Sequence, residues 1–341
     1  MRSAALTDEA LRAPVNVTWE ITEACNLSCR HCLSADLRAE QRGELTFETC
    51  RRIVDDLAAA DVFQINFGGG EPFLRDDFLD LLTYAHAKGI TTCVSTNGTL
   101  LDDDLAERLA VMPGLFLQVS LDGATAGTND AIRGAGTFAR ILEGVDCLRR
   151  HAVRDFSLNM VVTRVNVAEV GEFADLAAHL GAKARLSRFR PSGAGCATWE
   201  DFRLTSSQLL GLSEFLGEHT EILTGDSFFS LTPESRRRMG LTMCGAARMT
   251  MAVAPDGSVY PCAFLTDPAF LAGSAAADSP VAVFRESEVF ARLRNKDSAA
   301  CSGCSRFSTC HGGCPAVAYF VARSLDAGDP ECLMAALGAG V

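Results

Sequence analysis

Three cysteines stand close together near the start of the chain, at Cys25, Cys29 and Cys32 in the stretch CNLSCRHC. The residues before them, beginning MRSAALTDEALRAP, lack the apolar core of a secretory signal peptide, so we expect a cytoplasmic protein. In that reducing compartment, clustered cysteines are typical of metal ligands or redox groups and not of disulfides. The spacing C-x3-C-x2-C therefore predicts a metal site with three protein ligands.

Zinc and a four-iron cluster are the two candidates for this site. A zinc ion would need a fourth ligand such as His31, but a residue adjacent to Cys32 has difficulty pointing at the same metal. Zinc sites also favour C-x2-C pairs that two further ligands complete. Three thiolates instead suit a [4Fe-4S] cluster with one open iron, which could bind a substrate or cofactor directly. We therefore expect a [4Fe-4S] cluster at this loop.

Seven further cysteines form a second group between residues 244 and 332. Their spacing is C-x12-G-x4-C, then C-x2-C-x5-C-x3-C, then one last cysteine. Two zinc sites built from these thiols and His311 remain an alternative on spacing alone. The residues of the pattern are Cys244, Gly257, Cys262, Cys301, Cys304, Cys310, Cys314 and Cys332.

The other four cysteines are scattered along the chain. Cys50, Cys93 and Cys147 lie in segments with the apolar pattern of helices or strands, so we expect them to be small core residues. Cys196 lies in a glycine-rich loop, and the sequence assigns it no role.

The segments that must position the first cysteine loop alternate between strand and helix patterns. Strands are predicted at 15–22, 62–67, 90–95, 115–120, 156–163 and 183–189, with helices at 45–60, 77–88, 102–110, 137–151 and 168–180. Such alternation predicts an α/β fold with a parallel sheet covered by helices. No G-x-G-x-x-G follows the first strand, so we favour a (β/α)6 barrel, complete or partial, over a dinucleotide-binding sheet.

Besides the cysteine loop after the first strand, polar residues follow the next three strands, at the end of a barrel where active sites lie. Each loop alone is ordinary turn chemistry. Their convergence on one rim, next to the cysteine loop, favours a ligand site. The residues are Gly69, Gly70, Glu71 and Pro72 after the second strand, Ser95 and Asn97 after the third, and Ser120 and Asp122 after the fourth.

Together these features resemble the radical SAM enzymes, whose hallmark is C-x3-C-x2-C after the first strand of a partial (β/α)6 barrel. The resemblance implies that S-adenosylmethionine binds the open iron and is reductively cleaved to a 5′-deoxyadenosyl radical, which abstracts hydrogen from the substrate. It also implies that Arg133 pairs with the cofactor carboxylate, while His31 replaces an aromatic residue common in relatives. The GGEP motif (Gly69 to Pro72) would hold the methionyl amino group, and the ribose and methionyl part would lie near Ser95, Asn97, Ser120 and Asp122.

The second cysteine group resembles the SPASM domain, which binds two auxiliary [4Fe-4S] clusters and would bring the total to three. Relatives often supply an extra cysteine soon after the first, where this chain offers only Met249 and Met251. We therefore expect an inner cluster with an open or exchangeable iron. The resemblance implies an outer cluster on Cys301, Cys304, Cys310 and Cys332 and an inner cluster on Cys244, Cys262 and Cys314.

Among SPASM enzymes the chain resembles the mycofactocin peptide maturases, through stretches such as INFGGGEP, VSLDGATAGTNDAIRGAGTF, RFRPSGAG and LTGDSFF. That resemblance implies decarboxylation of the C-terminal tyrosine of a small precursor peptide and its carbon–carbon crosslinking to the preceding valine. Ala263, directly after Cys262, disfavours the sulfatase-activating branch, which has an acidic residue there. The alternatives are a sister maturase for another peptide, a SPASM dehydrogenase or epimerase acting on a small carbohydrate or amino acid, and a zinc- or cluster-bearing redox sensor.

The expected organisation is an N-terminal segment (1–14), a radical SAM core (15–198), a bridging segment (199–240) and a SPASM domain (241–341). Only 24 residues precede Cys25, so we expect a separate chaperone to bind the leader peptide and a flavodoxin- or ferredoxin-type protein to donate electrons. A net charge of −12 without a basic stripe disfavours nucleic acid, and no apolar run approaches the ~20 residues of a membrane span. The sequence identifies no residue that handles substrate protons or radicals.

Overall fold

The computed structural model describes residues 11–112, 114–224, 244–296 and 298–337. Within these residues the strands form one sheet in the order β6-β5-β4-β3-β2-β1-β7-β8-β9. The predicted α/β partial barrel is confirmed, because the first six strands all pair in parallel. They are β1 (Asn16–Thr22), β2 (Gln64–Gly69), β3 (Thr91–Thr96), β4 (Leu115–Ser120), β5 (Phe156–Val162) and β6 (Lys183–Arg188).

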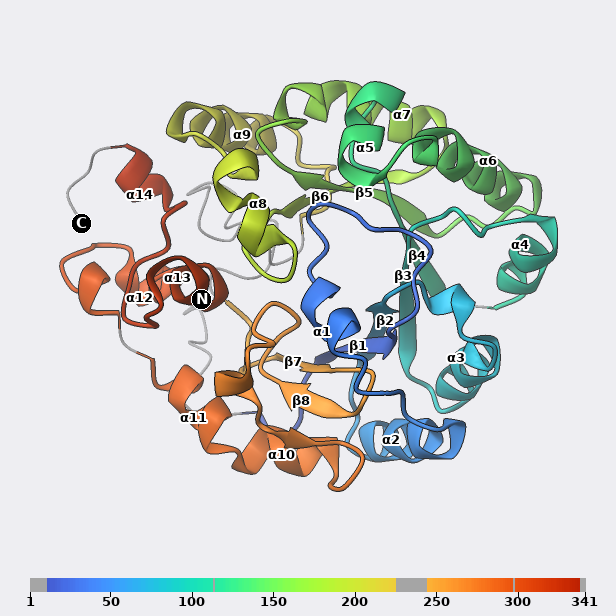
Figure 1. Ribbon diagram of the computed structural model, residues 1–341, viewed down its shortest axis with the longest axis horizontal. Helices are drawn as coiled ribbons and strands as arrows, with labels where there is room; N and C mark the ends of the chain where they lie inside the picture. The colour runs from blue at the N-terminus through green and yellow to red at the C-terminus, as the bar shows by residue number, and fades with distance from the viewer. Residues whose placement is uncertain (1–10, 113, 225–243, 297, 338–341) are drawn as a thin grey trace, which may run out of the picture.

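Helices connect these strands and cover the outer face of the curved sheet (Figure 1). Parallel neighbours need such crossovers because the chain must return to the same end of the sheet before the next strand begins. The carboxyl ends of the six strands therefore share one end of the barrel. The connecting helices are α2 (Phe47–Ala59), α3 (Phe78–Ala87), α4 (Asp103–Ala110), α5 (Ala126–Arg133), α6 (Thr137–Arg150) and α7 (Val170–His179).

Alternation along the strands separates an apolar outer face from a more polar interior. In β4, Leu115, Leu117 and Val119 are buried, whereas the side chains between them are half-buried. On the outer face, Trp19 of β1 stacks on Phe67 of β2, with ring centroids 5.8 Å apart. This packing attaches the helices to the strands and leaves the polar alternate positions facing the interior.

The sheet continues beyond the six predicted strands, which the sequence analysis did not foresee. Strand β7 (Thr250–Val253) pairs in parallel with β1, and β8 (Ser258–Tyr260) and β9 (Gly273–Ser274) follow as antiparallel neighbours. These strands are too short for a clear alternating pattern. They bring the segment between Cys244 and Cys262 against the first barrel strand.

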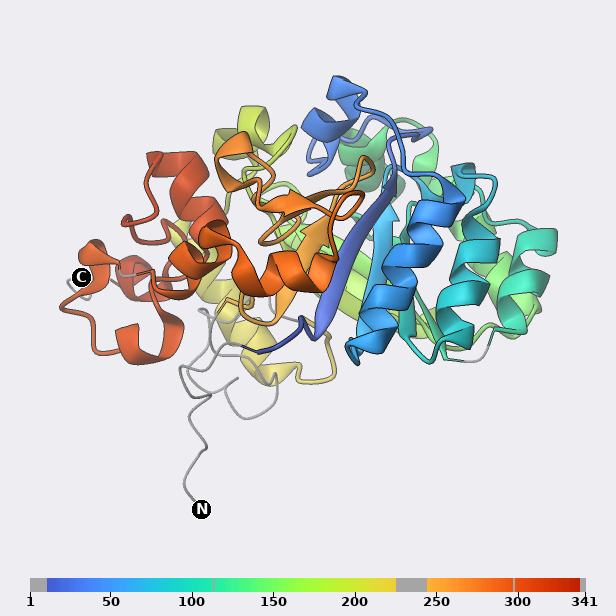
Figure 2. The ribbon, with the colours of Figure 1, turned by 90° about the horizontal axis from the view of Figure 1, so that it is seen from below.

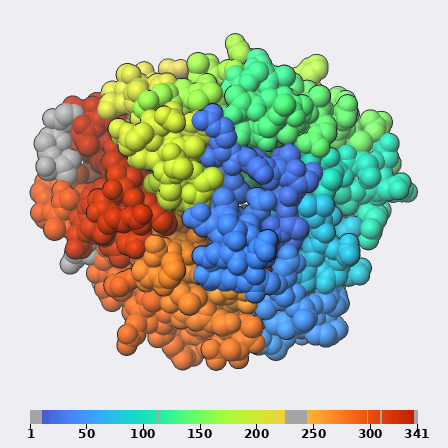
Figure 3. All heavy atoms as spheres, in the orientation of Figure 1, coloured from blue at the N-terminus to red at the C-terminus, as the bar shows by residue number. Residues whose placement is uncertain are grey.

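Helices outside the barrel units carry the rest of the described chain. Figure 2 shows the C-terminal helices at one side of the barrel, away from α3 and α4. Figure 3 shows the residues around α1 and α8 lying side by side across the front of the molecule. The helices are α1 (Ala35–Glu40), α8 (Gly195–Phe202), α9 (Ser206–Glu218), α10 (Pro280–Glu286), α11 (Glu288–Arg294), α12 (Phe307–Cys310), α13 (Pro315–Ala322) and α14 (Leu333–Ala336).

Candidate functional site

The first cysteine loop follows β1 directly, and each of its three thiols faces an N–H donor from a different element. Asn97 Nδ2, after β3, lies 4.0 Å from Cys25 Sγ. Arg133 Nη1, at the end of α5, lies 4.0 Å from the sulfur of Cys29. The Cys32 sulfur, in turn, lies 3.8 Å from Nη1 of an arginine in α1, Arg38. Donors around the sulfurs suit negatively charged thiolate ligands.

Burial governs the protonation of these thiols. It raises the pKa of Cys29 to about 11, although the Arg133 guanidinium opposes the shift. Burial likewise raises the pKa of Cys32. Without metal the two thiols are therefore protonated at neutral pH, and they must lose their protons to bind iron.

Arg38 is a residue that the sequence analysis missed. Besides Cys32, it contacts both limbs of the cysteine loop, donating from Nε to Glu23 O (3.0 Å) and from Nη2 to Leu27 O (3.4 Å). One planar guanidinium thus ties the loop together with several bonds. Its position in α1, six residues after the third cysteine, is visible in the sequence, but nothing there shows that its side chain reaches back to the cysteine loop.

The glycine triplet at the end of β2, Gly68 to Gly70, lies against the cysteine loop, backbone to backbone. Gly70 N donates to Thr22 O (2.8 Å), and Glu71 N donates to Ala24 O (2.7 Å). A Cβ on Gly70 would lie 1.9 Å from Ala24 O, and Gly69 has a φ of +110°, which side chains rarely adopt. Gly70 is therefore needed because the two loops approach too closely for a side chain, and Gly69 because its backbone conformation disfavours one. A tight turn alone would not exclude a side chain at Gly70.

The Glu71 carboxylate is completely buried and faces the loop after β3. It accepts hydrogen bonds from Thr96 Oγ1 (2.8 Å) and from the backbone N–H of Asn97 (2.7 Å). Asn97 in turn donates from Nδ2 to Asn26 Oδ1 (2.8 Å) in the cysteine loop. The GGEP motif, the loop after β3 and the cysteine loop thus form one connected rim, and Pro72 begins a short 3-10 turn at its edge.

Burial raises the pKa of Glu71 to about 7, above its ordinary 4.5, with the Asn97 and Thr96 hydrogen bonds opposing the shift. The protonated Glu71 carboxyl therefore stabilises the folded chain fully below pH 4.5, and this stabilisation is lost as the pH rises through about 7. In the metal-free chain we expect the free energy of unfolding to fall between pH 6 and 8 by about 1 kcal/mol more than in Glu71→Gln. Denaturant unfolding at both pH values measures this difference in slope.

The matched control for this slope is Glu48→Gln, since the Glu48 side chain is 79% exposed. It should leave the pH dependence unchanged. Glu20, whose pKa burial also raises to about 7, titrates in every variant and cancels from the comparison. Equal slopes for wild type and Glu71→Gln would contradict a raised pKa at Glu71.

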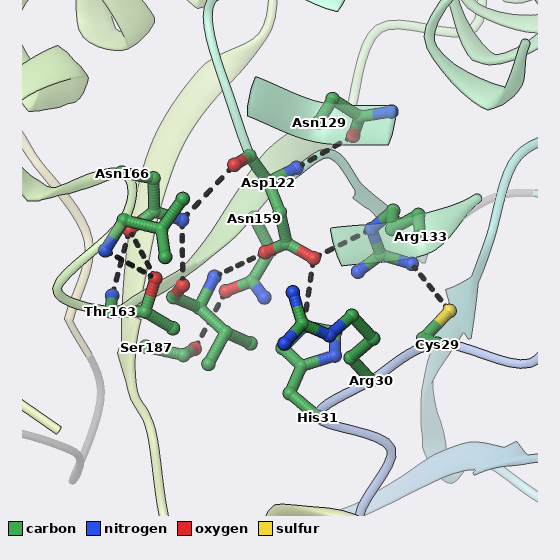
Figure 4. Close-up of polar contacts among 12 residues, drawn as sticks. Cys29, Arg30, His31, Asp122, Asn129, Arg133, Asn159, Thr163, Asn166 and Ser187 are labelled. Carbon is green, nitrogen blue, oxygen red and sulfur yellow. Dashed lines mark hydrogen bonds and ion pairs between the residues drawn. The ribbon is translucent and has the colours of Figure 1, made fainter. Parts of the chain in front are cut away.

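Asp122 forms the centre of a buried ion network after β4 (Figure 4). Its Oδ2 lies 2.7 Å from Arg133 Nε and 2.7 Å from His31 Nε2, while Oδ1 accepts the Val161 N–H (2.8 Å). Burial opposes ionisation, but Arg133 and His31 hold the pKa of Asp122 at about 2. Two cofactor positions expected from the sequence therefore contact each other directly.

His31 points toward this network. It lies next to Cys32 in sequence, but its Nε2 contacts Asp122, so it is engaged away from the three thiols. Two asparagines hold the Asp122 backbone: Asn129 Oδ1 accepts its N–H (3.0 Å), and Asn166 Nδ2 donates to its carbonyl (3.0 Å). Neither asparagine belongs to a strand-end motif, so no pattern in the sequence identifies it.

Ser95 and Ser120 occupy interior positions on β3 and β4. Ser95 Oγ donates to Asn66 Oδ1 (3.2 Å) and accepts from Gln118 Nε2 (3.4 Å), so β2, β3 and β4 share a polar row. Ser120 ends β4 and is half-buried. Strand alternation could have identified Gln118 as an interior residue, because it stands two residues before the predicted Ser120 on the same strand.

The loop after β6 closes against the cysteine loop. Ala194 N donates to Cys32 O (2.9 Å). Gly193 has a φ of +55°, and a Cβ there would lie 2.4 Å from Cys32 O. The stretch RPSG thus has a physical reason for its glycine. Arg190 in the same stretch stacks over the Phe264 ring at 4.2 Å, which joins this end of the barrel to the segment of Cys262.

The C-terminal cysteines are brought together by turns and short helices. Ala247 N donates to Pro261 O (3.1 Å), which places the turn of Cys244 beside that of Cys262. Burial raises the pKa of Cys310, and the Cys332 and Cys301 thiols act in the same direction because they lie nearby. One cavity of this region is lined by Cys244, Ala246, Arg248, Leu293, Lys296, Cys310, His311, Gly313 and Pro315. It therefore meets one cysteine from each of the two expected auxiliary sets.

Three expectations about scattered residues can also be compared with the structure. Cys50, Cys93 and Cys147 are buried, as predicted, whereas Cys196 is exposed. Met251 is fully buried in the core and in register with Val17 of β1. Residues 225–229 of the LTGDSFF stretch lie outside the described residues.

Comparison with known proteins agrees with this geometry. Residues 19–177 match the Radical SAM superfamily, and residues 244–306 match an iron-sulfur cluster-binding domain, SPASM. Mycofactocin maturase MftC of Mycobacterium ulcerans (strain Agy99) is 42% identical over 331 residues, covering 96% of this chain and 89% of that protein. The chain belongs to the mycofactocin maturase family. It is therefore a radical SAM enzyme with a SPASM domain.

Two solved structures of other proteins share the fold. Streptococcus suis SuiB bound to its precursor peptide SuiA superposes with a TM-score of 0.78 at 19% identity, covering 95% of this chain and 77% of SuiB. Native anSMEcpe with bound AdoMet gives a TM-score of 0.72 at 20% identity, covering 95% of this chain and 94% of anSMEcpe. At these identities the likeness extends to the fold alone.

The first cysteine loop is suited to an iron-sulfur cluster, because an N–H donor lies near each of its three sulfurs. In the part of the chain that the structure describes, no three His, Cys, Asp or Glu side chains converge to hold a single metal ion. A [4Fe-4S] cluster places each cysteine on a different iron, so its ligands stand further apart. Among the described helices, none is long and apolar enough to cross a membrane.

Proposed function

We propose that this radical SAM enzyme modifies a ribosomally made precursor peptide by mycofactocin-type chemistry. It would oxidatively decarboxylate a C-terminal tyrosine and join the product to the preceding valine through a carbon–carbon bond. The observation that carries this proposal is the 42% identity to mycofactocin maturase MftC over 96% of the chain. The first step removes carbon dioxide and two hydrogen atoms, and the second changes connectivity without changing composition.

We propose that Cys25, Cys29 and Cys32 hold the radical-generating cluster and that S-adenosylmethionine completes it. When bound, that cofactor supplies the hydrogen-abstracting 5′-deoxyadenosyl radical. The chain's own residues bind and orient it. The GGEP backbone lies against the cysteine loop, and Arg133 lies between Cys29 and Asp122, where its guanidinium can meet a carboxylate. The other proposed contacts are Ser95, Asn97, Ser120 and Asp122.

We propose two auxiliary clusters, which makes three in all. The outer one is assigned to Cys301, Cys304, Cys310 and Cys332. In support, the Cys301 and Cys332 thiols lie near enough to Cys310 to raise its pKa. The inner one is assigned to Cys244, Cys262 and Cys314 with one open or exchangeable iron. The burial of Met251 in the core supports the open iron, because that thioether lies on the apolar face of β7. Mössbauer spectra with four thiolates at both clusters would refute it.

The remaining expectations concern partners and organisation. A separate leader-peptide chaperone and a flavodoxin- or ferredoxin-type donor are proposed partners of this enzyme, which we place in the cytoplasm. We propose that the chain divides by function after residues 14, 198 and 240. The radical SAM core and the SPASM region are not separate sheets, because β7 of the SPASM region belongs to the barrel sheet.

The test is anaerobic incubation of reduced enzyme with S-adenosylmethionine and a peptide ending in Val-Tyr. We expect the peptide to lose the mass of carbon dioxide plus two hydrogen atoms, with formation of 5′-deoxyadenosine. The same peptide with a C-terminal amide should remain unchanged, because it has no carboxylate to lose. An unchanged Val-Tyr peptide together with turnover of a small polyol would favour the dehydrogenase alternative.

A further inference from the structure

A buried ion network joins the last barrel strand to the C-terminal cysteine segment. Arg188, the final residue of β6, is 4% exposed. Its Nη1 and Nη2 donate to the two oxygens of Asp329 (2.7 and 2.6 Å), and its Nε donates to Glu331 Oε2 (2.6 Å). The carboxylates come from a segment more than 140 residues away, immediately before Cys332.

Asp329 contacts the backbone of two cysteines that are assigned to different clusters. Its Oδ2 accepts the N–H of Cys314 (2.9 Å), and its own carbonyl accepts the N–H of Cys332 (3.0 Å). Its Oδ1 also accepts the N–H of Glu331 (3.0 Å). Each oxygen of this carboxylate therefore receives one guanidinium N–H and one backbone N–H.

Packing keeps this arrangement tight. Gly313, directly before Cys314, has a φ of +80°, and a Cβ on it would lie 2.4 Å from the Cβ of Asp329. The network holds two carboxylates and one guanidinium, all nearly inaccessible to water. A buried network of this kind is a weak source of stability, because desolvation offsets the attraction, but it fixes geometry through directional bonds.

We propose that Asp329 is a positioning residue for the auxiliary clusters. Anchored to the barrel by Arg188, it sets where Cys314 and Cys332 stand relative to the interior of the barrel, and thereby whether both cysteine sets are placed to hold iron. The inference deepens the proposed function and rests on its assignment of Cys314 and Cys332 as cluster ligands.

Two substitutions in the same network separate positioning from charge compensation. Asp329→Asn and Glu331→Gln each remove one negative charge and leave Arg188 with one carboxylate. In Asp329→Asn, however, the amide NH2 must face one guanidinium N–H and one backbone N–H, so two donors lose their acceptor. In Glu331→Gln the amide oxygen keeps the Arg188 bond, and only the 3.3 Å bond from Leu204 N is lost. Asp103→Asn, in an exposed pair with Arg150, controls for loss of an ion pair elsewhere.

The experiment is anaerobic reconstitution of these proteins, with iron counting and EPR before and after S-adenosylmethionine is added. We expect about twelve irons in wild type, Glu331→Gln and Asp103→Asn. Asp329→Asn should lose at least four of them, yet keep the EPR signal that responds to S-adenosylmethionine. Thermal unfolding of the metal-free chains, followed by circular dichroism, checks that each variant folds. If Asp329→Asn does not fold, Arg188→Lys replaces it. We then expect a partial loss of auxiliary iron, because lysine cannot donate two parallel hydrogen bonds to the Asp329 carboxylate as the Arg188 guanidinium does.

Three outcomes would overturn the inference. The first is unchanged iron and spectra in Asp329→Asn, or in Arg188→Lys where that variant replaces it. The second is an equal loss in Glu331→Gln, which would indicate charge compensation alone. The third is wild-type protein holding only about four irons, which would overturn the ligand assignment itself and leave Asp329 nothing to position. Failure of the Val-Tyr peptide reaction with twelve irons present would contradict the proposed substrate and leave the inference about Asp329 standing.

Discussion

Replacing Cys29 by alanine will abolish 5′-deoxyadenosine formation. Cys29 is one of three thiols on a single loop, and a cluster with two remaining protein ligands has two open irons and is not retained. The iron content should fall by about four atoms per chain, the content of one cluster. Incubation of the reduced, reconstituted protein with S-adenosylmethionine, followed by chromatography of the nucleosides, measures the loss.

The matched control is Cys196→Ala, which removes an exposed thiol outside both cysteine groups. It should retain full iron content and full 5′-deoxyadenosine formation. Product formed by Cys29→Ala at the wild-type rate would show that the radical-generating cluster lies elsewhere. The same loss in Cys196→Ala would show that the assay reports general damage.

Gly70→Ala will reduce 5′-deoxyadenosine formation at least about 100-fold, because misplacing a reacting group by about 1 Å costs that much. The new Cβ would lie 1.9 Å from Ala24 O, directly before Cys25. To relieve this contact, either the GGEP loop or the cysteine loop must therefore move by at least about 1 Å. The hydrogen bonds from Gly70 and Glu71 to the cysteine loop would be broken in the same movement.

Gly68→Ala provides the control within the same glycine triplet. A Cβ at Gly68 meets only Ser95 Cβ, at 3.8 Å, which is ordinary contact. We expect Gly68→Ala to keep most of the activity and all of its iron. Similar losses from both substitutions would mean that the triplet is sensitive to any side chain, which would contradict a specific need for close approach at Gly70.

Local patterns were sufficient to predict the barrel and the position of its site. Alternating strands and amphipathic helices gave the order of the six parallel strands, because each pattern depends only on which side of one element is buried. The cysteine spacing and the GGEP motif indicated which rim of the barrel carries the site, because both follow strands and the carboxyl ends of parallel strands meet at one end of the barrel. The family resemblance, confirmed by the comparisons, then indicated the chemistry of the cysteines.

Patterns of this kind did not reveal which side chains contact one another across the rim. Arg38 turns back to the cysteine loop, and His31 contacts Asp122 more than 90 residues away in the chain. Nothing in the residues around either one indicates its partner. Their partners follow from the directions in which the loops leave the sheet, which no periodicity records.

The sequence by itself determined where the two cysteine groups lie along the chain, the six parallel strands of the barrel and the loops that approach the first group. Only the tertiary structure decided that β7 joins the barrel sheet beside β1 and that Arg188 reaches Asp329. The physical reason is the range of the interactions. Burial periodicity and ligand spacing are set by neighbours along the chain, whereas strand pairing and buried ion networks are set by segments that meet only after the chain has folded.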